Sequence, residues 1–214
     1  MINLDDWLNS FVKVLRRNFG GRIWFIGVQG SYARGEAADT SDLDVVVILD
    51  EFTISDAKKY SAVLDELPHR NLICGFISGR SEILNWDAAE LFQFYYDTTP
   101  VFGSLEILQP RLDVDRAIKT GACTIYHGCV HNLIHEKSAD ILKSLYKTGA
   151  FVVQAIHFRK TGEYVHAHKN LTELADSAEK KILQNFFALK NGGVVDFDKL
   201  SEEIFLWSKN LITA

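Results

Sequence analysis

The chain has 214 residues, of which 47% are hydrophobic, and 28 acidic against 23 basic residues give a formal net charge of -5. This length can bury a sizeable core in one large domain or two small ones. The acidic balance argues against a long nucleic-acid track, because phosphate binding depends on clustered Lys and Arg. No apolar run approaches the ~18–20 residues of a spanning helix, so we expect no membrane association.

The cellular compartment is predicted from the N-terminus and the cysteines. The first residues lack the basic stretch and apolar core of a signal peptide. The three cysteines, Cys74, Cys123 and Cys129, are odd in number and scattered. Such spacing favours free thiols in a reducing compartment over a disulfide framework. We therefore expect a cytoplasmic protein, and the oligomeric state stays open.

The first half of the chain predicts alternating helices and strands. Apolar residues at helical spacing from Leu4 to Phe19 stop at Gly20-Gly21, which indicates an amphipathic helix with a glycine stop. Short β-branched and aromatic runs over 23–28 and 45–49 predict strands buried on both faces. Four further elements are expected in order: a helix over about 55–67, a strand over 72–77, a short helix around 86–95 and an edge strand over 101–105.

The second half predicts helices alone. From Leu112 onward the apolar residues keep a helical step, with breaks at Gly162 and Gly192-Gly193, which gives four or five helices able to form a bundle. The change of pattern falls at Pro110. We therefore predict an α/β domain over residues 1–110 and a helical domain over 111–214.

Two polar segments beside the predicted strands carry the chemistry. Asp42 and Asp44 are two apart at the start of a strand, so their carboxylates share a face. Paired carboxylates are hard oxygen ligands that suit Mg²⁺. Gly30 permits close backbone approach to a ligand, and Ser31 offers a hydroxyl and an amide where a strand passes into a helix, a setting that favours phosphate. Together the segments predict a site for a metal-bound phosphate.

Each of three neighbouring residues allows two interpretations. Arg34 is one turn after Ser31, where it reaches the same phosphate or holds the loop. Ser41 contacts the ligand or satisfies backbone groups of a turn. Glu36 takes part in the site or is a solvated partner for Arg34.

These segments resemble the signature of the DNA polymerase beta-like nucleotidyltransferase superfamily. The resemblance rests on Gly30-Ser31-x-Ala33-Arg34-Gly35-Glu36 and Ser41-Asp42-x-Asp44, and is greatest to small bacterial aminoglycoside adenylyltransferases and minimal nucleotidyltransferases. It implies a mixed sheet in the first domain and an acceptor-binding helical bundle in the second. It also implies Asp42 and Asp44 as catalytic Mg²⁺ ligands, with Gly30 and Ser31 on the triphosphate of ATP or another nucleotide.

The chain departs from the family at the third carboxylate. The resemblance implies an acid on a later strand that helps to deprotonate the attacking hydroxyl, but the strand over 72–77 reads Leu-Ile-Cys-Gly-Phe-Ile. The nearest replacements are Glu82, Asp87 and Asp97. We assign Asp97 to the catalytic set as the candidate base, although it equally suits a turn. Glu163, in the second domain, is a further candidate.

A second polar group lies in the helical half. His127, His131 and His135 are four apart on one expected helix, which is compatible with a metal site. The outer two are two turns, roughly 12 Å, apart and cannot share one tetrahedral ion, so a polar stripe is the favoured interpretation. Metal binding by these histidines stays open.

The functional hypothesis that follows is transfer of a nucleoside monophosphate, AMP in particular, from a Mg-triphosphate to a hydroxyl of a small, aminoglycoside-like acceptor. We expect the acceptor to bind between the two domains. Two alternatives stay open. One is a protein-directed adenylyltransferase that acts as an antitoxin, and the other is a degenerate nucleotide-binding protein without the third carboxylate.

Overall fold

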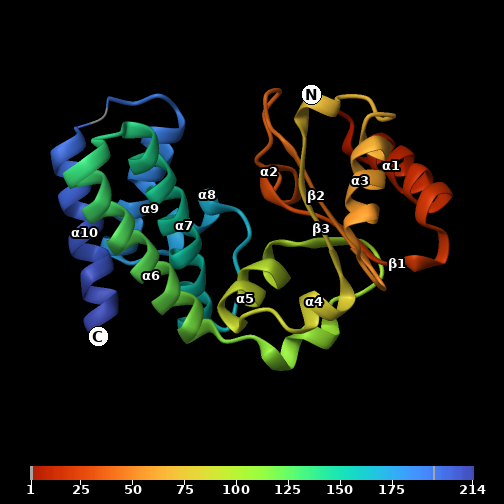
Figure 1. The fold of residues 1–214 in the computed structure, drawn as a ribbon. Helices are drawn as coiled ribbons and strands as arrows, with labels where there is room; N and C mark the ends of the chain where they lie inside the picture. Colours follow the sequence, from red (N-terminus) through yellow and green to blue (C-terminus); the bar gives the residue numbers. More distant parts are fainter. Residues whose placement is uncertain (1, 195) are drawn as a thin grey trace. The chain divides into compact units, whose positions relative to one another are not determined.

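The computed structural model describes residues 2–194 and 196–214, which form two compact units (Figure 1). The first comprises Met1–Asp87 with Phe94–Arg111, and the second comprises Ala88–Gln93 with Leu112–Ala214. The first contains a sheet with helices, and the second is helical. This arrangement confirms the α/β fold followed by a helical part.

The first unit is built on a four-stranded mixed sheet. Its strands are β1 (Ile23–Val28), β2 (Leu43–Leu49), β3 (Ile73–Gly79) and β4 (Thr99–Phe102), in the order β3-β2-β1-β4. β2 and β3 are parallel, whereas β1 is antiparallel to both β2 and β4. The edge strand, expected over 101–105, starts earlier because Thr99 pairs with Val28, and ends earlier because Gly103 has a φ of 79°.

Helices α1 (Leu4–Phe19) and α3 (Ile54–Leu64) cover one face of this sheet (Figure 1). The apolar stripe of α1 packs with Leu43, Val45 and Val47 of β2 in one buried cluster. Both helix starts are capped: Asn3 accepts a hydrogen bond from the amide of Asp6, and Thr53 forms a capping box with Asp56. The helix predicted over about 55–67 therefore starts directly after its cap, at Ile54, and it ends at Leu64.

Aromatic side chains pack beside strand β3. The ring of Phe76 lies 4.9 Å from Trp86 and 6.2 Å from Phe94. Helices α4 (Arg80–Leu84) and α5 (Ala88–Asp97) follow this strand, so the short helix expected around 86–95 is confirmed as α5. The remaining short segments are 3-10 turns at Gly20–Arg22, Arg70–Leu72 and Glu106–Arg111.

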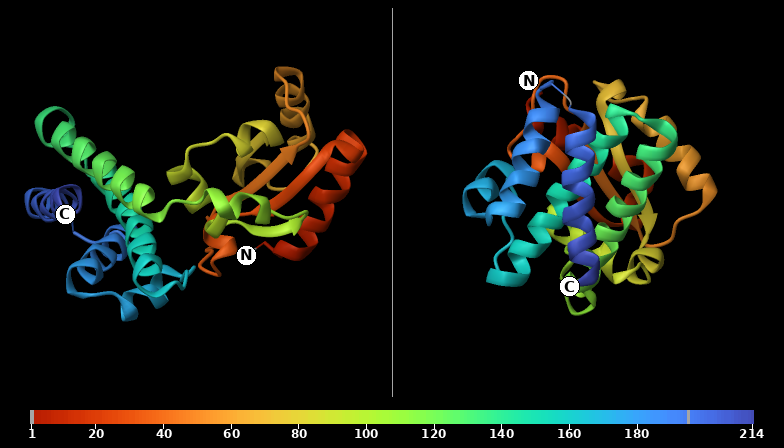
Figure 2. Two further views of the ribbon diagram at one scale, coloured as in Figure 1. Left: turned by 90° about the horizontal axis from the view of Figure 1, so that it is seen from below. Right: turned by 90° about the vertical axis from the view of Figure 1, so that its left-hand side faces the viewer.

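From Leu112 onward, the described residues of the second unit contain five α-helices, four of them long and one short. They are α6 (Val114–His131), α7 (Ala139–Thr161), α8 (His168–Leu174), α9 (Ser177–Lys190) and α10 (Phe197–Thr213), with a π-helical turn at Asn132–Glu136. Helix α7 packs against α6, α9 and α10, and Figure 2 shows α6 and α10 side by side. Both predicted breaks are confirmed, since Gly162 ends α7 in a left-handed conformation and Gly192-Gly193 follows α9.

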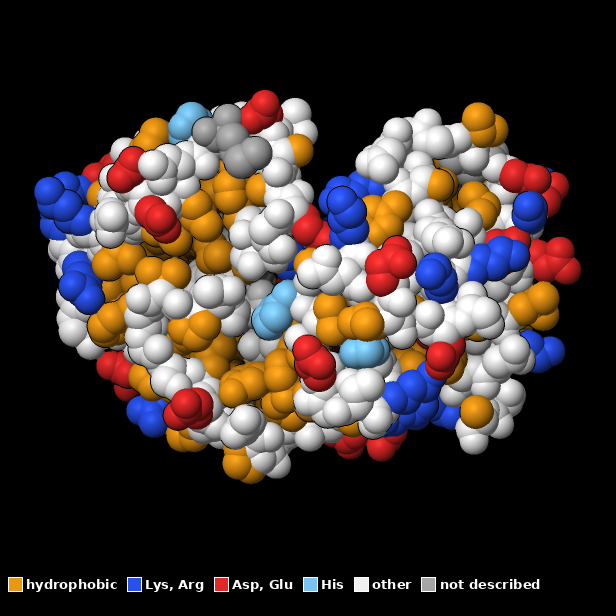
Figure 3. All heavy atoms as spheres, turned by 180° about the vertical axis from the view of Figure 1, so that it is seen from behind, with side chains coloured by type: hydrophobic (Ala, Val, Ile, Leu, Met, Phe, Trp, Pro, Cys, Tyr) orange, Lys and Arg blue, Asp and Glu red, His pale blue; other side chains and the backbone are white. Residues whose placement is uncertain are grey.

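On the face drawn in Figure 3, Lys and Arg side chains are interspersed with Asp and Glu side chains. In the described part of the chain, no helix combines the length and the apolar character needed to cross a membrane.

Candidate active site

The paired aspartates lie at the start of strand β2. Leu43 and Val45 belong to the cluster that packs on α1, so alternation directs Asp44 to the opposite face of the sheet. Asp44 is half-buried, whereas Asp42, just before the strand, is exposed. The expectation placed both aspartates in the strand, but only Asp44 is part of it.

The glycine-serine turn lies directly on the carboxylate of Asp44. Gly30 begins the four-residue helix α2 (Gly30–Ala33) and has a φ of 69°. A Cβ atom at this position would lie 2.0 Å from Oδ2 of Asp44. One residue earlier, the amide of Gln29 donates to the carbonyl of Asp44 over 2.7 Å. The turn and the carboxylate, 14 positions apart in the sequence, are therefore brought together as the spacing predicts.

Arg34 and Asp97, predicted as a phosphate contact and a base, contact each other instead. The Nη1 atom of Arg34 lies 2.9 Å and 3.1 Å from the two carboxylate oxygens of Asp97. Nε of Arg34 also donates to Glu36 over 3.3 Å. The side chains of Arg34 and Asp97 are only 8% and 9% exposed, so each charge is balanced mainly within the protein. This geometry favours a structural role for both residues.

A second contact holds the other end of the same turn. The side-chain amide of Gln29 donates to the hydroxyl of Thr98 over 2.7 Å, and that hydroxyl donates to the carbonyl of Phe94. A Cβ atom at Gly27 would lie 2.5 Å from the Thr98 methyl group, so glycine leaves room for this threonine. Sequence reasoning missed Gln29 and Thr98, because nothing local relates two residues 69 positions apart.

Ser41 closes a turn before strand β2. Its hydroxyl accepts a hydrogen bond from the amide of Ala38 over 2.8 Å, and its own amide donates to the carbonyl of Ala38 over 3.0 Å. Of the two interpretations for Ser41, these contacts favour the turn residue.

Strand β3 carries a thiol, and no carboxylate, at the position beside Asp44. Cys74 is the registered neighbour of Asp44 in the parallel pair of strands, and it is exposed. Gly75 has a φ of 119°, and a Cβ atom there would lie 2.0 Å from the carbonyl oxygen of Val45. Glu82 approaches Gly79 at the far end of β3, so it does not replace the missing acid.

The histidines of the second unit are arranged as a surface stripe. The rings of His131 and His135 lie 4.8 Å apart, and His131 is 3.6 Å from Glu136. His127 is exposed. Over residues 2–194 and 196–214, no group of three or more His, Cys, Asp or Glu side chains is placed to hold a metal ion. A metal at Asp42 and Asp44 would therefore need oxygens of its phosphate substrate and water, as Mg²⁺ commonly does.

Gln154 holds the loop that follows helix α7. Its side-chain amide donates to the carbonyl oxygens of Val165 and His166 over 2.8 Å and 3.0 Å. The Nε2 atom of His168 lies 3.1 Å from the Gln154 carbonyl oxygen, and both side chains are buried. The only signal for this role in the sequence is a glutamine within the apolar run Val152 to Ile156.

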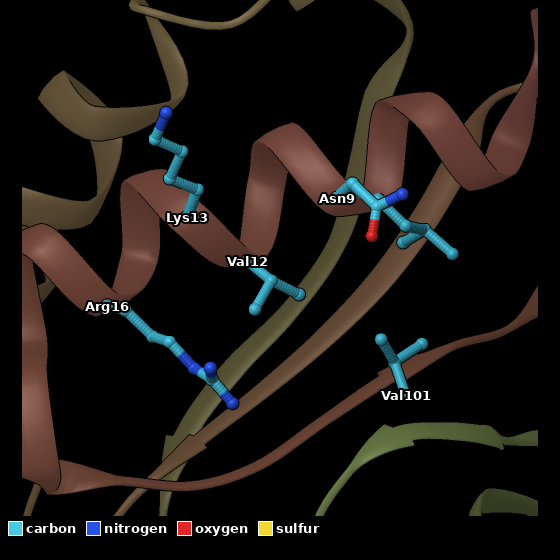
Figure 4. Close-up of a pocket in the computed structure, with 6 residues that line it drawn as sticks. Asn9, Val12, Lys13, Arg16 and Val101 are labelled. Atoms are coloured by element: carbon cyan, nitrogen blue, oxygen red, sulfur yellow. The ribbon is translucent and has the colours of Figure 1, made fainter.

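A separate hollow of about 420 Å³ lies between α1 and β4, where Val12 and Val101 face each other (Figure 4). Leu8, Asn9, Lys13 and Arg16 complete its lining. Helix α1 covers the face of the sheet opposite to Asp44, so this hollow is not part of the candidate active site.

Comparison with known proteins adds the family. Residues 8–81 match the family described as "Nucleotidyltransferase domain". The structure is similar to spectinomycin adenyltransferase AAD(9) from Enterococcus faecialis, solved with ATP and spectinomycin, at 14% identity and a TM-score of 0.59. That alignment covers 98% of this chain and 99% of the other.

Two toxin–antitoxin structures are less similar. One was solved with AMP-PNP (19% identity, TM-score 0.33) and the other is a mutant MntA–HpeT pair (17% identity, TM-score 0.32). Each alignment covers 60% of this chain and 95% of the other. Comparison with curated protein sequences gives no match.

The fold and the matched segment define an enzyme of the nucleotidyltransferase class. More particularly, residues 8–81 match a nucleotidyltransferase domain of the polymerase beta-like superfamily, and they include both the glycine-serine turn and the paired aspartates.

Proposed function

We propose that the protein transfers AMP from Mg-ATP to a hydroxyl group of a small, aminoglycoside-like molecule. The single observation that carries the proposal is the contact between the turn at Gly30 and the carboxylate of Asp44. A turn that accepts phosphate and a carboxylate that accepts a metal must lie together if one Mg-triphosphate is to bind both.

The roles within the site follow from these contacts. Asp42 and Asp44 would hold Mg²⁺, which would supply neutralisation of charge on the triphosphate, while the backbone at Gly30 and the amide and hydroxyl of Ser31 would hold the phosphates. The acceptor hydroxyl attacks the α-phosphorus in line, and pyrophosphate leaves. Ser41 shapes the loop that leads to the aspartates, through its two hydrogen bonds with Ala38.

The proton of the acceptor hydroxyl has no obvious recipient in strand β3. Cys74 stands beside Asp44, and Asp97 is engaged with Arg34. We propose that Mg²⁺ held by Asp42 and Asp44 would supply the activation of the acceptor hydroxyl in place of a side-chain base. Without such a base the reaction is slower than it would be with a carboxylate next to Asp44.

The acceptor is assigned to the helical part, residues 111–214, by analogy of fold with the adenyltransferase above, which was solved with spectinomycin. The choice of ATP rests on the same analogy. The three free cysteines accord with a cytoplasmic enzyme.

The test is a screen for pyrophosphate release with each labelled triphosphate against aminoglycosides, spectinomycin, lincosamides and a cell extract. We expect release with ATP and a hydroxylated small molecule, and transfer of label to that molecule. Label found on a protein of the extract would favour a protein-directed enzyme. Tight Mg-triphosphate binding without transfer to any acceptor would favour a nucleotide-binding protein.

A further inference from the structure

The turn that carries Gly30 and Ser31 is fixed at both of its ends to two consecutive residues. At its start, Gln29 donates to Thr98 over 2.7 Å. At its end, Arg34 binds both oxygens of Asp97, at 2.9 Å and 3.1 Å. Because Asp97 ends helix α5 and Thr98 precedes strand β4, one junction between a helix and a strand contacts both ends of the turn.

The junction adds polar contacts to a turn that also packs against the hydrophobic core of the first unit, through Tyr32 and Ala33. Its internal bonds join the amide of Arg34 to the carbonyl of Gly30 and the amide of Glu36 to the carbonyl of Ser31. These bonds shape the turn but do not place it. Together with the packing of Tyr32 and Ala33, its position is set by the amide of Gln29 on the Asp44 carbonyl and by the two side-chain contacts with the junction.

We propose that Asp97 is a positioning residue for nucleotide binding: it holds Arg34 and thereby keeps the Gly30–Ala33 turn against the carboxylate of Asp44. The inference rests on the proposed function, because it concerns the same Mg-triphosphate site. It replaces the assignment of Asp97 as the base. A carboxylate that is 9% exposed and bound twice by a guanidinium is poorly placed to take a proton from a hydroxyl.

The same unit offers a matched control. Arg22 and Asp56 also form an ion pair, at 2.8 Å, with the Asp56 side chain only 8% exposed. Arg22 lies next to the end of β2 opposite to Asp44, since its carbonyl accepts from the amide of Asp50 just after that strand. A variant without this pair therefore loses a buried carboxylate's ion pair, as Asp97→Asn does, but keeps all contacts of the turn.

The experiment compares Asp97→Asn, Arg34→Gln, the double variant and Asp56→Asn, by Mg-ATP calorimetry and by hydrogen exchange of the amides of Arg34 and Glu36. We expect Asp97→Asn and Arg34→Gln to lower affinity about tenfold or more, since small misplacements of binding groups are costly. The double variant should lose no more than the worse single variant, because the two residues act as one unit. Exchange should accelerate in all three, and Asp56→Asn should keep wild-type affinity and exchange.

Three results would overturn the inference. One is unchanged affinity and exchange in a folded Asp97→Asn variant. Another is turnover about 10²–10⁴-fold lower with affinity spared and the acidic limb of the pH–rate profile lost, which is the behaviour of a base. The third is equal loss of affinity in Asp56→Asn.

Two additional measurements keep the test decisive. If Asp97→Asn does not fold, Asp97→Glu and Arg34→Lys preserve the charges with altered geometry, and should show the same changes to a smaller degree; wild-type behaviour in both would refute the inference. A wild-type protein that binds no Mg-triphosphate refutes the proposed function, and this inference with it. Normal wild-type binding with unaffected variants refutes this inference alone.

Discussion

Strands β2 and β3 start side by side and run parallel, yet their second residues, Asp44 and Cys74, differ in chemistry. At the start of β2, Asp44 presents a carboxylate against the backbone of Gly30. At the registered position of β3, Cys74 presents a thiol, and the next residue, Gly75, admits no side chain because Val45 lies too close. The proposed site for a metal-bound triphosphate thus has a carboxylate on β2, while the neighbouring strand β3 lacks an acid.

This difference separates two requirements of nucleotidyl transfer. Binding needs hard oxygen ligands and close backbone approach to phosphate, which Asp42, Asp44 and the turn can supply. Deprotonation of the acceptor needs a base within hydrogen-bond reach, which β3 does not offer. Variants on the two strands should therefore change different steps.

The largest effect is expected on strand β2. Replacing both aspartates, Asp42→Asn and Asp44→Asn, should lower Mg-ATP affinity by about 100-fold or more, because amides are poor substitutes for carboxylates at a divalent cation. Calorimetry with and without Mg²⁺ measures the change. Undiminished affinity in a folded double variant would remove the two-aspartate site from consideration.

The turn beside β2 should respond more to backbone than to side-chain changes. Gly30→Val combines a φ of 69° with a Cβ atom 2.0 Å from the Asp44 carboxylate, so we expect a loss of affinity of about tenfold or more. Ser31→Ala retains the backbone amide and should lose only a few-fold. The order of the two is decisive: a tolerated Gly30→Val would mean that this turn does not hold phosphate.

A gain is expected on strand β3. Cys74→Asp places a carboxylate next to Asp44 and should raise turnover about tenfold, within the range that a positioned base contributes. Cys123→Asp, at the other exposed cysteine, is the matched control and should leave turnover unchanged. Pyrophosphate release with the acceptor found by the screen gives the rates. Equal rates for both variants would show that a base at this position is not what limits the reaction.

The smallest effect on nucleotide binding is expected for Asp56, which lies near the end of β2 that is far from Asp44. Hydrogen bonds from Arg22 and then Thr53 hold the pKa of Asp56 well below its usual range. A carboxyl whose pKa is lowered by folding stabilises the protein above the unfolded pKa of about 3.9, and this stabilisation is lost as the pH falls from about 4 toward the folded pKa.

Asp56→Asn should therefore reduce stability at pH 7 by about 1 kcal/mol, as for a helix cap, and the deficit should shrink below pH 4. Urea unfolding at pH 7 and pH 3 measures both quantities. Asp65→Asn, from the exposed pair with Arg70, is the control and should change little. A deficit that is the same at both pH values would contradict the linkage.

The sequence predicted the parts of the site that are local in the chain. Strand periods, the glycine stop at Gly20 and the turn–strand spacing of Gly30 and Asp44 are short-range patterns, and the structure agrees with them. The sequence over 72–77 also predicted that this strand has no acid, and the register of the sheet then showed that Cys74 is the residue beside Asp44.

Contacts between residues far apart in the chain could not be predicted from the sequence. Arg34 and Asp97 are 63 residues apart, and a charged residue near a glycine-rich turn is equally compatible with a phosphate contact or an ion pair. The choice depends on burial, which removes both side chains from water and requires each to find a partner. The hydrogen bonds of Gln29 with Thr98 and of Gln154 with the loop carbonyls were likewise not predicted, because they too depend on which residues the fold brings together.

The loop after helix α7 has a consequence for how the enzyme can diversify. Gln154 binds the main-chain oxygens of Val165 and His166, which any residue at those positions would also provide. The path of the loop is therefore largely independent of the side chains at these two positions. Substitutions at Val165 and His166 can therefore alter what the loop presents to its surroundings while its two backbone bonds to Gln154 persist.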